Sequence, residues 1–324
     1  MAAYKDIKGT QVPVVSSNPD NPVKGQVWYN TTDQVLRGAI FTEAWATGGD
    51  LGTARYMLGQ AGTQTAGLAF GGYPGPAKTN ATEEYGGTSW TAGNNMGTAR
   101  YALGGTGTQT AAVGFGGFDS SSLANTEEYD GTNWTSSNAM PVAKRGMGSA
   151  GIQTAGLSFG GLLQTSANVA TTEEYDGSSW TGSGAMNTAR RFLAGCGTQT
   201  AGLGFAGLEN TPSPGARLAS TEEYDGSSWT ASNNLNTARD RVGGSGEQTA
   251  GLAFGGSLPA VSNATEQYDG STWTTTTNMS TARYGLSGAG TSSLGLAFGG
   301  STGSPVDNTE EFTAAVSTKT ITGS

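Results

Sequence analysis

Residues 126–134 read TEEYDGTNW, and nearly the same string returns at residues 172–180, 221–229 and 265–273. The tryptophan that ends the string recurs at six positions: Trp45, Trp90, Trp134, Trp180, Trp229 and Trp273. These tryptophans are spaced by 45, 44, 46, 49 and 44 residues. A period of this size is typical of propellers and solenoids, so the repeat predicts the architecture of the chain.

Each repeat has the pattern of four short strands. In one repeat, residues 100–105 form a strand of small residues, residues 107–110 read GTQT, and residues 111–117 form an apolar strand that ends in Phe-Gly-Gly. A loop of variable length leads to the Glu-Glu-Tyr strand, and an Asp-Gly turn leads to the strand that carries the tryptophan. Short glycine-containing turns between such strands favour β-hairpins.

Four further sets of residues recur once per repeat. Arginines stand at Arg55, Arg100, Arg145, Arg190, Arg239 and Arg283, and phenylalanines at Phe70, Phe115, Phe159, Phe205, Phe254 and Phe298. The third strand ends in Tyr85, Tyr129, Tyr175, Tyr224, Tyr268 or Phe312, and an apolar residue follows six positions after every tryptophan, at Leu51, Met96, Met140, Met186, Leu235 and Met279. Such regularity predicts core positions. We expect each arginine to bind a neighbouring blade's glutamate or loop carbonyls.

The two ends of the repeat array complete each other. The last repeat stops at Phe312 without a tryptophan, while residues 41–45 provide a fourth strand with no preceding three. We therefore expect a closed ring, in which the strand around Trp45 completes the blade that begins at Arg283. Closure removes free sheet edges, which would otherwise favour aggregation.

In order and spacing these residues resemble the kelch repeat, with an Arg that opens the first strand, a di-glycine that ends the second, Tyr-Asp after the third and a Trp in the fourth. The resemblance covers about residues 39–312, although Ala206 replaces the first glycine of one pair. It implies an all-β fold, a six-bladed kelch-type β-propeller closed by an N-terminal strand. Kelch propellers serve many functions, so the resemblance predicts the fold and not an activity.

Residues 1–38 precede the repeats, and residues 313–324 follow them as a C-terminal tail. Within residues 21–33 the sequence NPVKGQVWYNTTD is similar to a segment of tail-fibre and other structural proteins of bacteriophages. That resemblance implies a small β-hairpin near an attachment region. We interpret residues 1–38 as an attachment or oligomerisation segment in which Val27, Trp28 and Tyr29 make the contacts, because this apolar cluster is too small to fold alone.

The composition excludes several kinds of catalytic site. The chain has no histidine and one cysteine, so it cannot form a Ser-His-Asp triad, a histidine-ligated metal site or an intrachain disulfide. Cys196 is interpreted as a small buried residue. The Glu-Glu pairs could suggest two-carboxylate glycosidase chemistry, but a catalytic pair is needed once and these recur, so a structural role is favoured. We predict no cofactor, no metal and no enzymatic activity.

Charge and hydropathy limit the partners. The formal net charge is −9, and the basic residues are scattered through the repeats, which argues against nucleic acid. There is no apolar run long enough to span a bilayer and no signal-peptide core near the N-terminus. We expect assembly in a host cytoplasm, location in a virion, and partners that are other virion proteins, copies of the same chain, or a host surface glycan or protein.

The loops between the second and third strands differ most among the repeats, in length and in chemistry. They are residues 73–81, 118–125, 162–171, 208–220, 257–264 and 301–308. Strand connections alternate between the two faces of a propeller, so these loops share one face, and loops on a rigid scaffold often carry recognition. The candidate binding residues are Tyr73, Lys78, Phe118, Asp119, Leu162, Glu209, Arg217 and Asp307. Solvated loops without a ligand are the alternative.

Three functions remain open at this stage. The first is a non-enzymatic phage virion protein, such as a tail fibre, an appendage or a capsid decoration, whose variable-loop face recognises a host surface or a neighbouring protein. The second is a carbohydrate-active enzyme or a lectin on the same fold. The third is an intracellular kelch adaptor for protein interactions.

Overall fold

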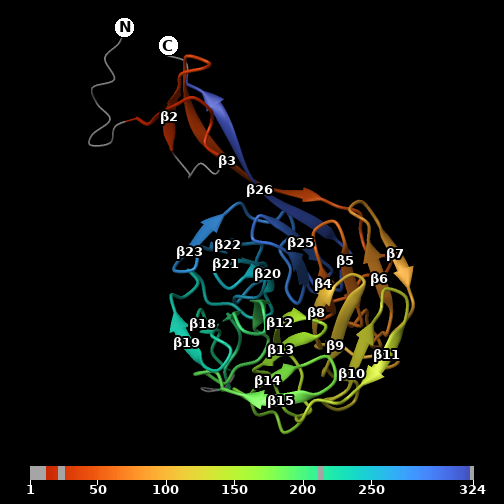
Figure 1. The fold of residues 1–324 in the computed structure, drawn as a ribbon. Coiled ribbons are helices and arrows are strands. Elements are labelled where there is room, and N and C mark those ends of the chain that lie inside the picture. The colour runs from red at the N-terminus through yellow and green to blue at the C-terminus, as the bar shows by residue number, and fades with distance from the viewer. Residues whose placement is uncertain (1–11, 21–25, 211–214, 322–324) are drawn as a thin grey trace. The chain divides into compact units, whose positions relative to one another are not determined.

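The computed structural model describes residues 12–20, 26–210 and 215–321. Within these ranges every regular element is a β-strand (Figure 1), and no helix there could cross a membrane. The chain forms two compact units, residues 44–312 and residues 1–43 together with 313–324. The larger unit is the propeller.

The first five blades are four-stranded antiparallel sheets. The first blade comprises β4 (Gly59–Gly62), β5 (Gly67–Phe70), β6 (Thr82–Tyr85) and β7 (Trp90–Gly93), and the second β8 (Gly104–Thr108), β9 (Ala111–Phe115), β10 (Thr126–Tyr129) and β11 (Trp134–Ser137). The third comprises β12 (Gly148–Ile152), β13 (Ala155–Phe159), β14 (Thr172–Tyr175) and β15 (Trp180–Ser183). The fourth has β16 (Ala194–Gly197), β17 (Gly202–Phe205), β18 (Thr221–Tyr224) and β19 (Trp229–Ser232), and the fifth β20 (Gly243–Glu247), β21 (Ala250–Phe254), β22 (Thr265–Tyr268) and β23 (Trp273–Thr276).

The sixth blade closes the ring, as the sequence predicted. It takes β24 (Ser287–Gly290), β25 (Leu294–Phe298) and β26 (Thr309–Thr320), with β3 (Val35–Thr47) next to β26 in the strand order. The innermost strands contact one another in a full cycle, from β4 through β8, β12, β16 and β20 to β24 and back to β4. The prediction of a six-bladed kelch-type propeller closed by an N-terminal strand is therefore confirmed.

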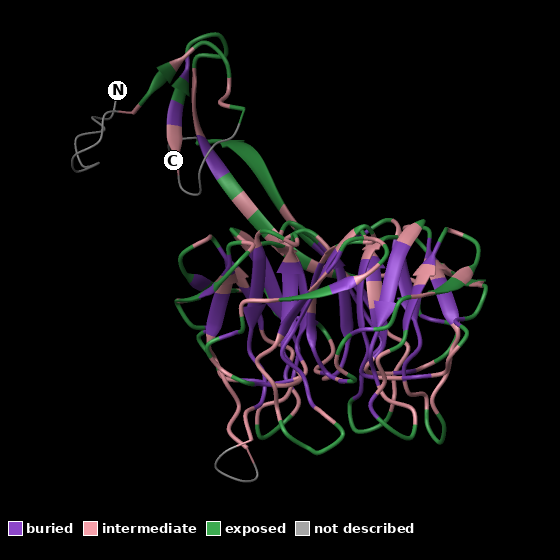
Figure 2. Cartoon of the chain, turned by 60° about the horizontal axis from the view of Figure 1, so that its bottom comes forward, coloured by how far each residue is buried: buried purple, intermediate pink, exposed green. Residues whose placement is uncertain are grey.

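Small residues in the innermost strands allow the blades to approach closely. A Cβ added to Gly105 would lie 2.4 Å from Cζ of Phe70 in the preceding blade. Phe70 itself is fully buried, as are its five counterparts in the other repeats. The glycine-rich composition thus follows from packing around a narrow axis, and Figure 2 shows the strands of the blades as largely buried.

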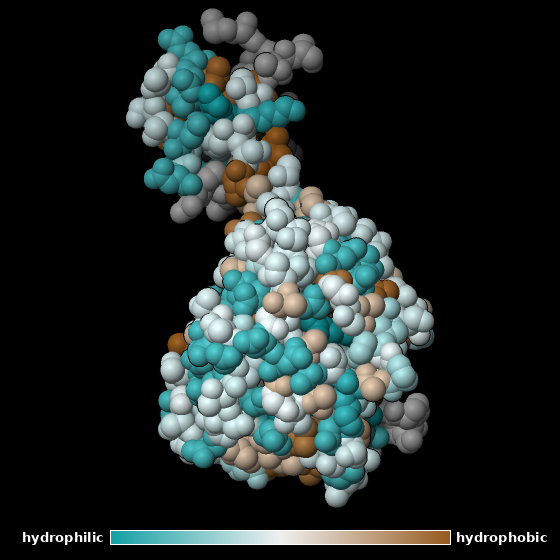
Figure 3. Space-filling model, turned by 90° about the vertical axis from the view of Figure 1, so that its right-hand side faces the viewer, coloured by the Kyte–Doolittle hydropathy of each residue, from teal (hydrophilic) through white to brown (hydrophobic). Residues whose placement is uncertain are grey.

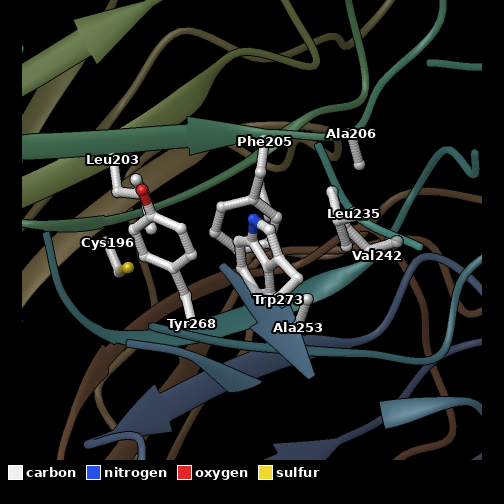
Figure 4. Packing of buried hydrophobic residues seen from close by; sticks show 10 residues of the cluster. Cys196, Leu203, Phe205, Ala206, Leu235, Val242, Ala253, Tyr268 and Trp273 are labelled. Carbon is white, nitrogen blue, oxygen red and sulfur yellow. The ribbon is translucent and has the colours of Figure 1, made fainter. Parts of the chain in front are cut away.

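Each tryptophan joins its blade to the preceding one. Trp273 packs against Phe205 and Tyr268, with ring centroids 4.9 and 5.0 Å away (Figure 4). Its Nε1 donates a hydrogen bond to Thr221 Oγ1 at 3.0 Å. Trp45 makes the corresponding contacts with Phe254 and Thr265 of the fifth blade. The tryptophans are not equally buried: Trp180, Trp229 and Trp273 are buried, while Trp45, Trp90 and Trp134 are half-buried.

The first glutamate of each Glu-Glu pair binds the basic residue that precedes the innermost strand of the same blade. Arg100 Nη2 lies 3.1 Å from Glu127 Oε1, and both side chains are buried. Arg100 Nη1 also donates to the loop carbonyl of Asn125 at 3.0 Å. The loop-carbonyl contact was predicted, but the glutamate belongs to the same blade and not to a neighbouring one.

One member of the predicted arginine set is wrong. In the third blade Lys144 occupies the buried position and pairs with Glu173, whereas Arg145 is half-buried and makes no such pair. The strand that follows sets the alignment of this segment. It places residue 144, and not residue 145, at the buried position that an arginine occupies in the other blades. Arg145 is thereby available for the surface of the molecule.

The second glutamate of each pair accepts a hydrogen bond from the tyrosine of the next blade. Tyr224 Oη donates to Glu174 Oε1 at 2.5 Å, and four other tyrosines make the same bond: Tyr85, Tyr129, Tyr175 and Tyr268. The sixth position of this ladder differs, because Phe312 has no hydroxyl and the facing residue is Gln267. The Glu-Glu pairs are therefore structural, as the sequence favoured.

The smaller unit contains the predicted hairpin. β2 (Val27–Asn30) pairs with β3 in an antiparallel register that places Trp28 opposite Arg37, and β1 (Val14–Val15) pairs with β2 in parallel. Residues 1–11 and 21–25 of the predicted attachment segment, and residues 322–324 of the predicted tail, lie outside the described residues. Figure 3 shows apolar residues grouped on this unit. Among its described residues, the exposed large apolar ones are Val14, Tyr29, Ile40, Val316 and Ile321.

Candidate functional site

Each variable loop pairs through its backbone with the residue that follows the buried Arg or Lys of the same blade. The first residue of each loop makes an antiparallel bridge with one of these residues. The bridged pairs are Tyr56 with Tyr73, Tyr101 with Phe118, Arg145 with Leu162, Arg191 with Leu208, Asp240 with Ser257, and Tyr284 with Ser301. This face therefore combines the variable loops with one variable residue from the start of every blade.

A closed ring of backbone hydrogen bonds surrounds the axis just beyond these residues. Each ring residue donates its N–H to the carbonyl of the ring residue in the preceding blade, at 2.7 or 2.8 Å. The six ring residues are Met57, Ala102, Gly146, Phe192, Arg241 and Gly285. All have positive φ, between 53° and 61°, a left-handed conformation that costs about 1–2 kcal/mol for a residue other than glycine. Four blades adopt it without glycine, so the ring of hydrogen bonds holds them there.

Aromatic side chains form an arc over one half of this ring. Tyr56 packs against Tyr284 at 6.1 Å and against Tyr73 at 5.7 Å, measured between ring centroids. Tyr73 lies 5.3 Å from Tyr101, which lies 5.6 Å from Phe118. All five side chains are half-buried, so each still presents part of its surface to solvent.

Guanidinium groups occupy the other half. The Cζ atom of Arg145 lies 4.3 Å from the centre of the Phe118 ring, and that of Arg241 lies 4.6 Å from Phe192 and 5.7 Å from Tyr284. Arg191 lies 5.8 Å from Phe192. Together these residues make a ring-shaped group around the mouth of the channel, here called the mouth cluster: Tyr56, Tyr73, Tyr101, Phe118, Arg145, Arg191, Phe192, Arg241 and Tyr284.

The arginines are held by mostly neutral partners. Arg145 Nη1 donates to Ser122 Oγ at 3.0 Å, and Arg191 Nη1 donates to Asn168 Oδ1 at 2.8 Å. The buried carboxylate of Asp240 lies 3.0 Å from Arg241 Nη1 and 2.9 Å from Arg217 Nε. Within the part of the chain that the structure describes, no carboxylate forms an ion pair with Arg145 or Arg191.

The charges in the mouth cluster repel one another. Burial lowers the pKa of Arg191, and the positive charges of Arg241 and Arg145 lower it further, against the opposing effect of Asp240. Burial also lowers the pKa of Arg145. Positive charge is thus concentrated here without full compensation, an arrangement that favours an anion.

The channel below the mouth is narrow. A cavity of about 100 Å³ is lined by the ring residues and by Leu58, Leu103, Met147, Leu193, Val242 and Leu286. Pockets that enclose a small organic ligand are usually about 300–1,000 Å³. A ligand of that size would therefore lie on the mouth cluster and not inside the channel.

Several predicted binding residues lie in or beside the mouth cluster. Tyr73 and Phe118 belong to it. Lys78 Nζ donates to the carbonyl of Asp119 at 2.9 Å and so joins two loops. The carboxylate of Asp119 accepts hydrogen bonds from Ser120 and Ser121, which lower its pKa to about 2.

The other predicted residues lie outside the mouth cluster. Leu162 is buried and so offers little surface. Glu209 is half-buried, and its N–H donates to the carbonyl of Ala216 across a loop whose residues 211–214 lie outside the described residues. Arg217 holds Asp240, and Asp307 accepts a hydrogen bond from Leu51 through its carbonyl.

The sequence interpretation missed seven members of the mouth cluster: Tyr56, Tyr101, Arg145, which was assigned to the structural arginines, Arg191, Phe192, Arg241 and Tyr284. A signal for them exists in the alignment of the repeats. The position after the constant basic residue reads Tyr, Tyr, Arg, Arg, Asp and Tyr, and the next reads Met, Ala, Gly, Phe, Arg and Gly. At these two positions the residue type varies among the repeats, although the preceding basic residue is constant. Such variation indicates that core packing does not determine these residues and that they lie at the surface.

In the smaller unit, Trp28 is fully buried and donates from Nε1 to Asn18 Oδ1 at 3.1 Å. It belongs to the core of that unit, while Tyr29 is 37% exposed on the opposite side of the strand and Val27 is half-buried. Of the three predicted attachment residues, Tyr29 offers the most surface to a partner.

Neither a metal site nor a reactive thiol is present among residues 12–20, 26–210 and 215–321. No group of three or more Asp, Glu or Cys side chains there could hold a metal ion. Cys196 is a free, buried cysteine, as predicted, and burial raises the pKa of its thiol well above the ordinary value.

The comparisons with known proteins support the fold. No family model matches the sequence, and no curated protein matches it. A solved structure, described as the structure of YjhT, superposes with a TM-score of 0.70 at 12% sequence identity, and the match covers 84% of this chain and 99% of that chain. At this identity the likeness shows the fold alone, so the chain is a kelch-like β-propeller whose activity has to be inferred from its own residues.

Proposed function

We propose that this chain is a non-enzymatic binding protein whose mouth cluster receives the ligand. The main support is the mouth cluster itself. Every blade contributes to it, and the contributed residues differ among the blades, whereas the core positions repeat the same residue or a similar one. These residues include four tyrosines and three arginines, the types that most often dominate binding energy at interfaces. The backbone ring beside the cluster holds four residues other than glycine at positive φ, a strain that folded proteins tend to keep at functional positions.

The absence of catalysis is part of the proposal. The recurring carboxylates are engaged in the blades by arginine, lysine or tyrosine, and Asp240 is engaged by two arginines. The chain has no histidine. These features support binding over bond cleavage.

We further propose that the smaller unit attaches the propeller to a larger assembly, and that this assembly is a phage virion. The support is the resemblance of residues 21–33 to phage structural proteins and the exposed apolar residues of that unit. The test uses a lysate of cells infected with a phage whose genome encodes the chain. The protein should sediment with the intact phage particles. Recovery only from the soluble fraction would contradict the virion location.

Binding is tested with the full chain on a printed array of bacterial surface polysaccharides and peptides. The triple variant Tyr73→Ala, Phe118→Ala, Arg191→Ala should lose the signals that the unchanged chain gives. The control Glu247→Gln changes an exposed residue on the opposite face and should keep them. Equal signals from both variants would contradict the proposed site, and release of new reducing ends from a bound polysaccharide would contradict the non-enzymatic assignment.

A further inference from the structure

The basic residues of the propeller that do not pair with a glutamate of the third strands all lie on one face. Residues 44–312 contain eleven lysines and arginines, of which six form the buried pairs with the Glu-Glu strands. The other five are Lys78, Arg145, Arg191, Arg217 and Arg241, on the variable loops or in the mouth cluster. Five acidic residues share this face: Asp50, Asp119, Glu209, Asp240 and Asp307.

The opposite face has the reverse character. Its Asp-Gly turns expose Asp130, Asp176, Asp225 and Asp269, and the turn after β20 exposes Glu247. None of these five basic residues lies there. In a chain with a net charge of −9, the variable-loop face therefore carries no excess of acidic residues, whereas the opposite face does. Electrostatic repulsion would thus keep an anionic ligand from the opposite face and favour the variable-loop face.

The mouth cluster is chemically divided. One half carries the aromatic side chains Tyr284, Tyr56, Tyr73, Tyr101 and Phe118, and the other half carries Arg145, Arg191 and Arg241. A ligand that matches both halves needs flat apolar faces with hydroxyl groups at one place and an anionic group at another. Guanidinium groups bind carboxylates in a planar, two-pronged geometry.

Two other classes of anion fit less well. Nucleic acid is dense in phosphate and needs many basic contacts, which five residues on an otherwise acidic protein do not provide. An acidic protein partner would bury anchor side chains in deep pockets, but the cavity next to the mouth cluster is only about 100 Å³. Sugar rings need no deep pocket, because their apolar faces lie on exposed aromatic side chains.

We propose that the ligand of the mouth cluster is an acidic polysaccharide, with a carboxylate on Arg145, Arg191 and Arg241 and an adjacent sugar ring on the tyrosines. This inference rests on the proposed binding function and adds the class of ligand. Asp240 acts as a positioning residue, because its buried carboxylate holds Arg241 and Arg217 in place.

The experiment measures binding of the full chain to four immobilised polymers: polygalacturonate, its methyl-esterified form, dextran sulfate and polyglutamate. Polygalacturonate should bind about tenfold or more tightly than the neutral ester, which lacks the charge that arginine recognises. Polyglutamate should bind weakly, since it has the charge without sugar rings. Binding of dextran sulfate would show whether a sulfate group can take the place of the sugar carboxylate on the arginines.

Variants separate the two halves of the site. Arg191→Gln should weaken binding to polygalacturonate by about tenfold or more, and Arg191→Lys, which keeps the charge, should weaken it less. Tyr101→Ala should weaken polygalacturonate binding more than polyglutamate binding. Lys319→Gln makes the same loss of charge in the smaller unit and should leave binding unchanged, and equal thermal melting of all variants would exclude misfolding.

The outcomes distinguish the ligand class from the binding function. If the neutral ester binds as tightly as polygalacturonate and Tyr101→Ala weakens both, the mouth cluster binds glycans but the acidic assignment is wrong. If polyglutamate binds as tightly as polygalacturonate, charge alone governs binding and the glycan assignment is wrong. If no polymer binds and the printed array is also negative, the proposed function itself is wrong.

Discussion

The seam between the fifth and sixth blades offers a direct test of how the blades are held together. At the other seams a tyrosine donates to the second glutamate of the preceding blade, but here Phe312 faces Gln267. The glutamine that elsewhere follows the first strand is also absent, because Ser292 stands at its position. Gln267 Nε2 instead donates to the carbonyl of Ser292 at 2.9 Å. The substitutions Gln267→Glu and Phe312→Tyr, alone and together, would restore the common ladder.

The expected magnitudes follow from the contacts. Phe312 is fully buried, and a hydroxyl added there meets the Gln267 amide, so Phe312→Tyr should change the free energy of unfolding by less than about 1 kcal/mol. Gln267→Glu removes the bond to Ser292 and leaves a carboxylate without its donor, at a cost of about 1–3 kcal/mol. In the double variant the tyrosine hydroxyl donates to the carboxylate. A hydrogen bond to a charged group contributes about 1.5–3 kcal/mol, and this is the expected coupling energy.

Urea unfolding of the four proteins, followed by tryptophan fluorescence, measures the coupling through a double-mutant cycle. The slope of each unfolding curve should stay constant, so that the midpoints report stability. Tyr224→Phe is the matched control at an ordinary seam, since it removes the 2.5 Å bond to Glu174. A coupling energy below about 0.5 kcal/mol, with a clear loss in Tyr224→Phe, would refute the idea that Gln267 and Phe312 replace one hydrogen-bonded pair.

Four further predictions concern the blades and their closure. Lys144→Met should cost about 3–5 kcal/mol because it leaves the buried Glu173 unpaired, whereas Arg145→Met should cost less than about 1 kcal/mol; equal losses in urea unfolding would contradict the corrected register. Burial and a hydrogen bond to glutamate raise the pKa values of Tyr175, Tyr224 and Tyr268 to about 12, so the folded state keeps protons that the unfolded chain loses above about pH 10. The stability from these tyrosines should therefore be complete below about pH 10 and fall as the pH rises to about 12, and flat unfolding curves over that range would argue against it. Trp229→Ala should lower the free energy of unfolding by about 3–5 kcal/mol. Thr172→Val removes only the acceptor of the 2.8 Å hydrogen bond from Trp229 Nε1 and should lower the free energy of unfolding by about 1 kcal/mol. Deletion of residues 1–47 should cause aggregation by opening the sixth blade, a result that light scattering would show and that a monomeric product with unchanged melting would contradict.

The sequence by itself determined the number of blades, the four strands of each blade and the closure by the strand around Trp45. It could do so because a repeat makes the same contacts in every copy, so that residues such as Phe70 and Tyr85 recur at positions where packing allows no alternative. The short loops and glycine turns then limit how neighbouring strands pair.

Only the tertiary structure decided what lies at the mouth of the channel. The residues of the mouth cluster come from all six blades, and they meet because the ring closes around its axis. The structure also decided that Lys144, and not Arg145, is buried, since a shift of one residue in register is set by the strand that follows. Contacts that repeat along the chain can be read from its period, whereas contacts across the axis depend on closure and on the conformation of each blade's first residues.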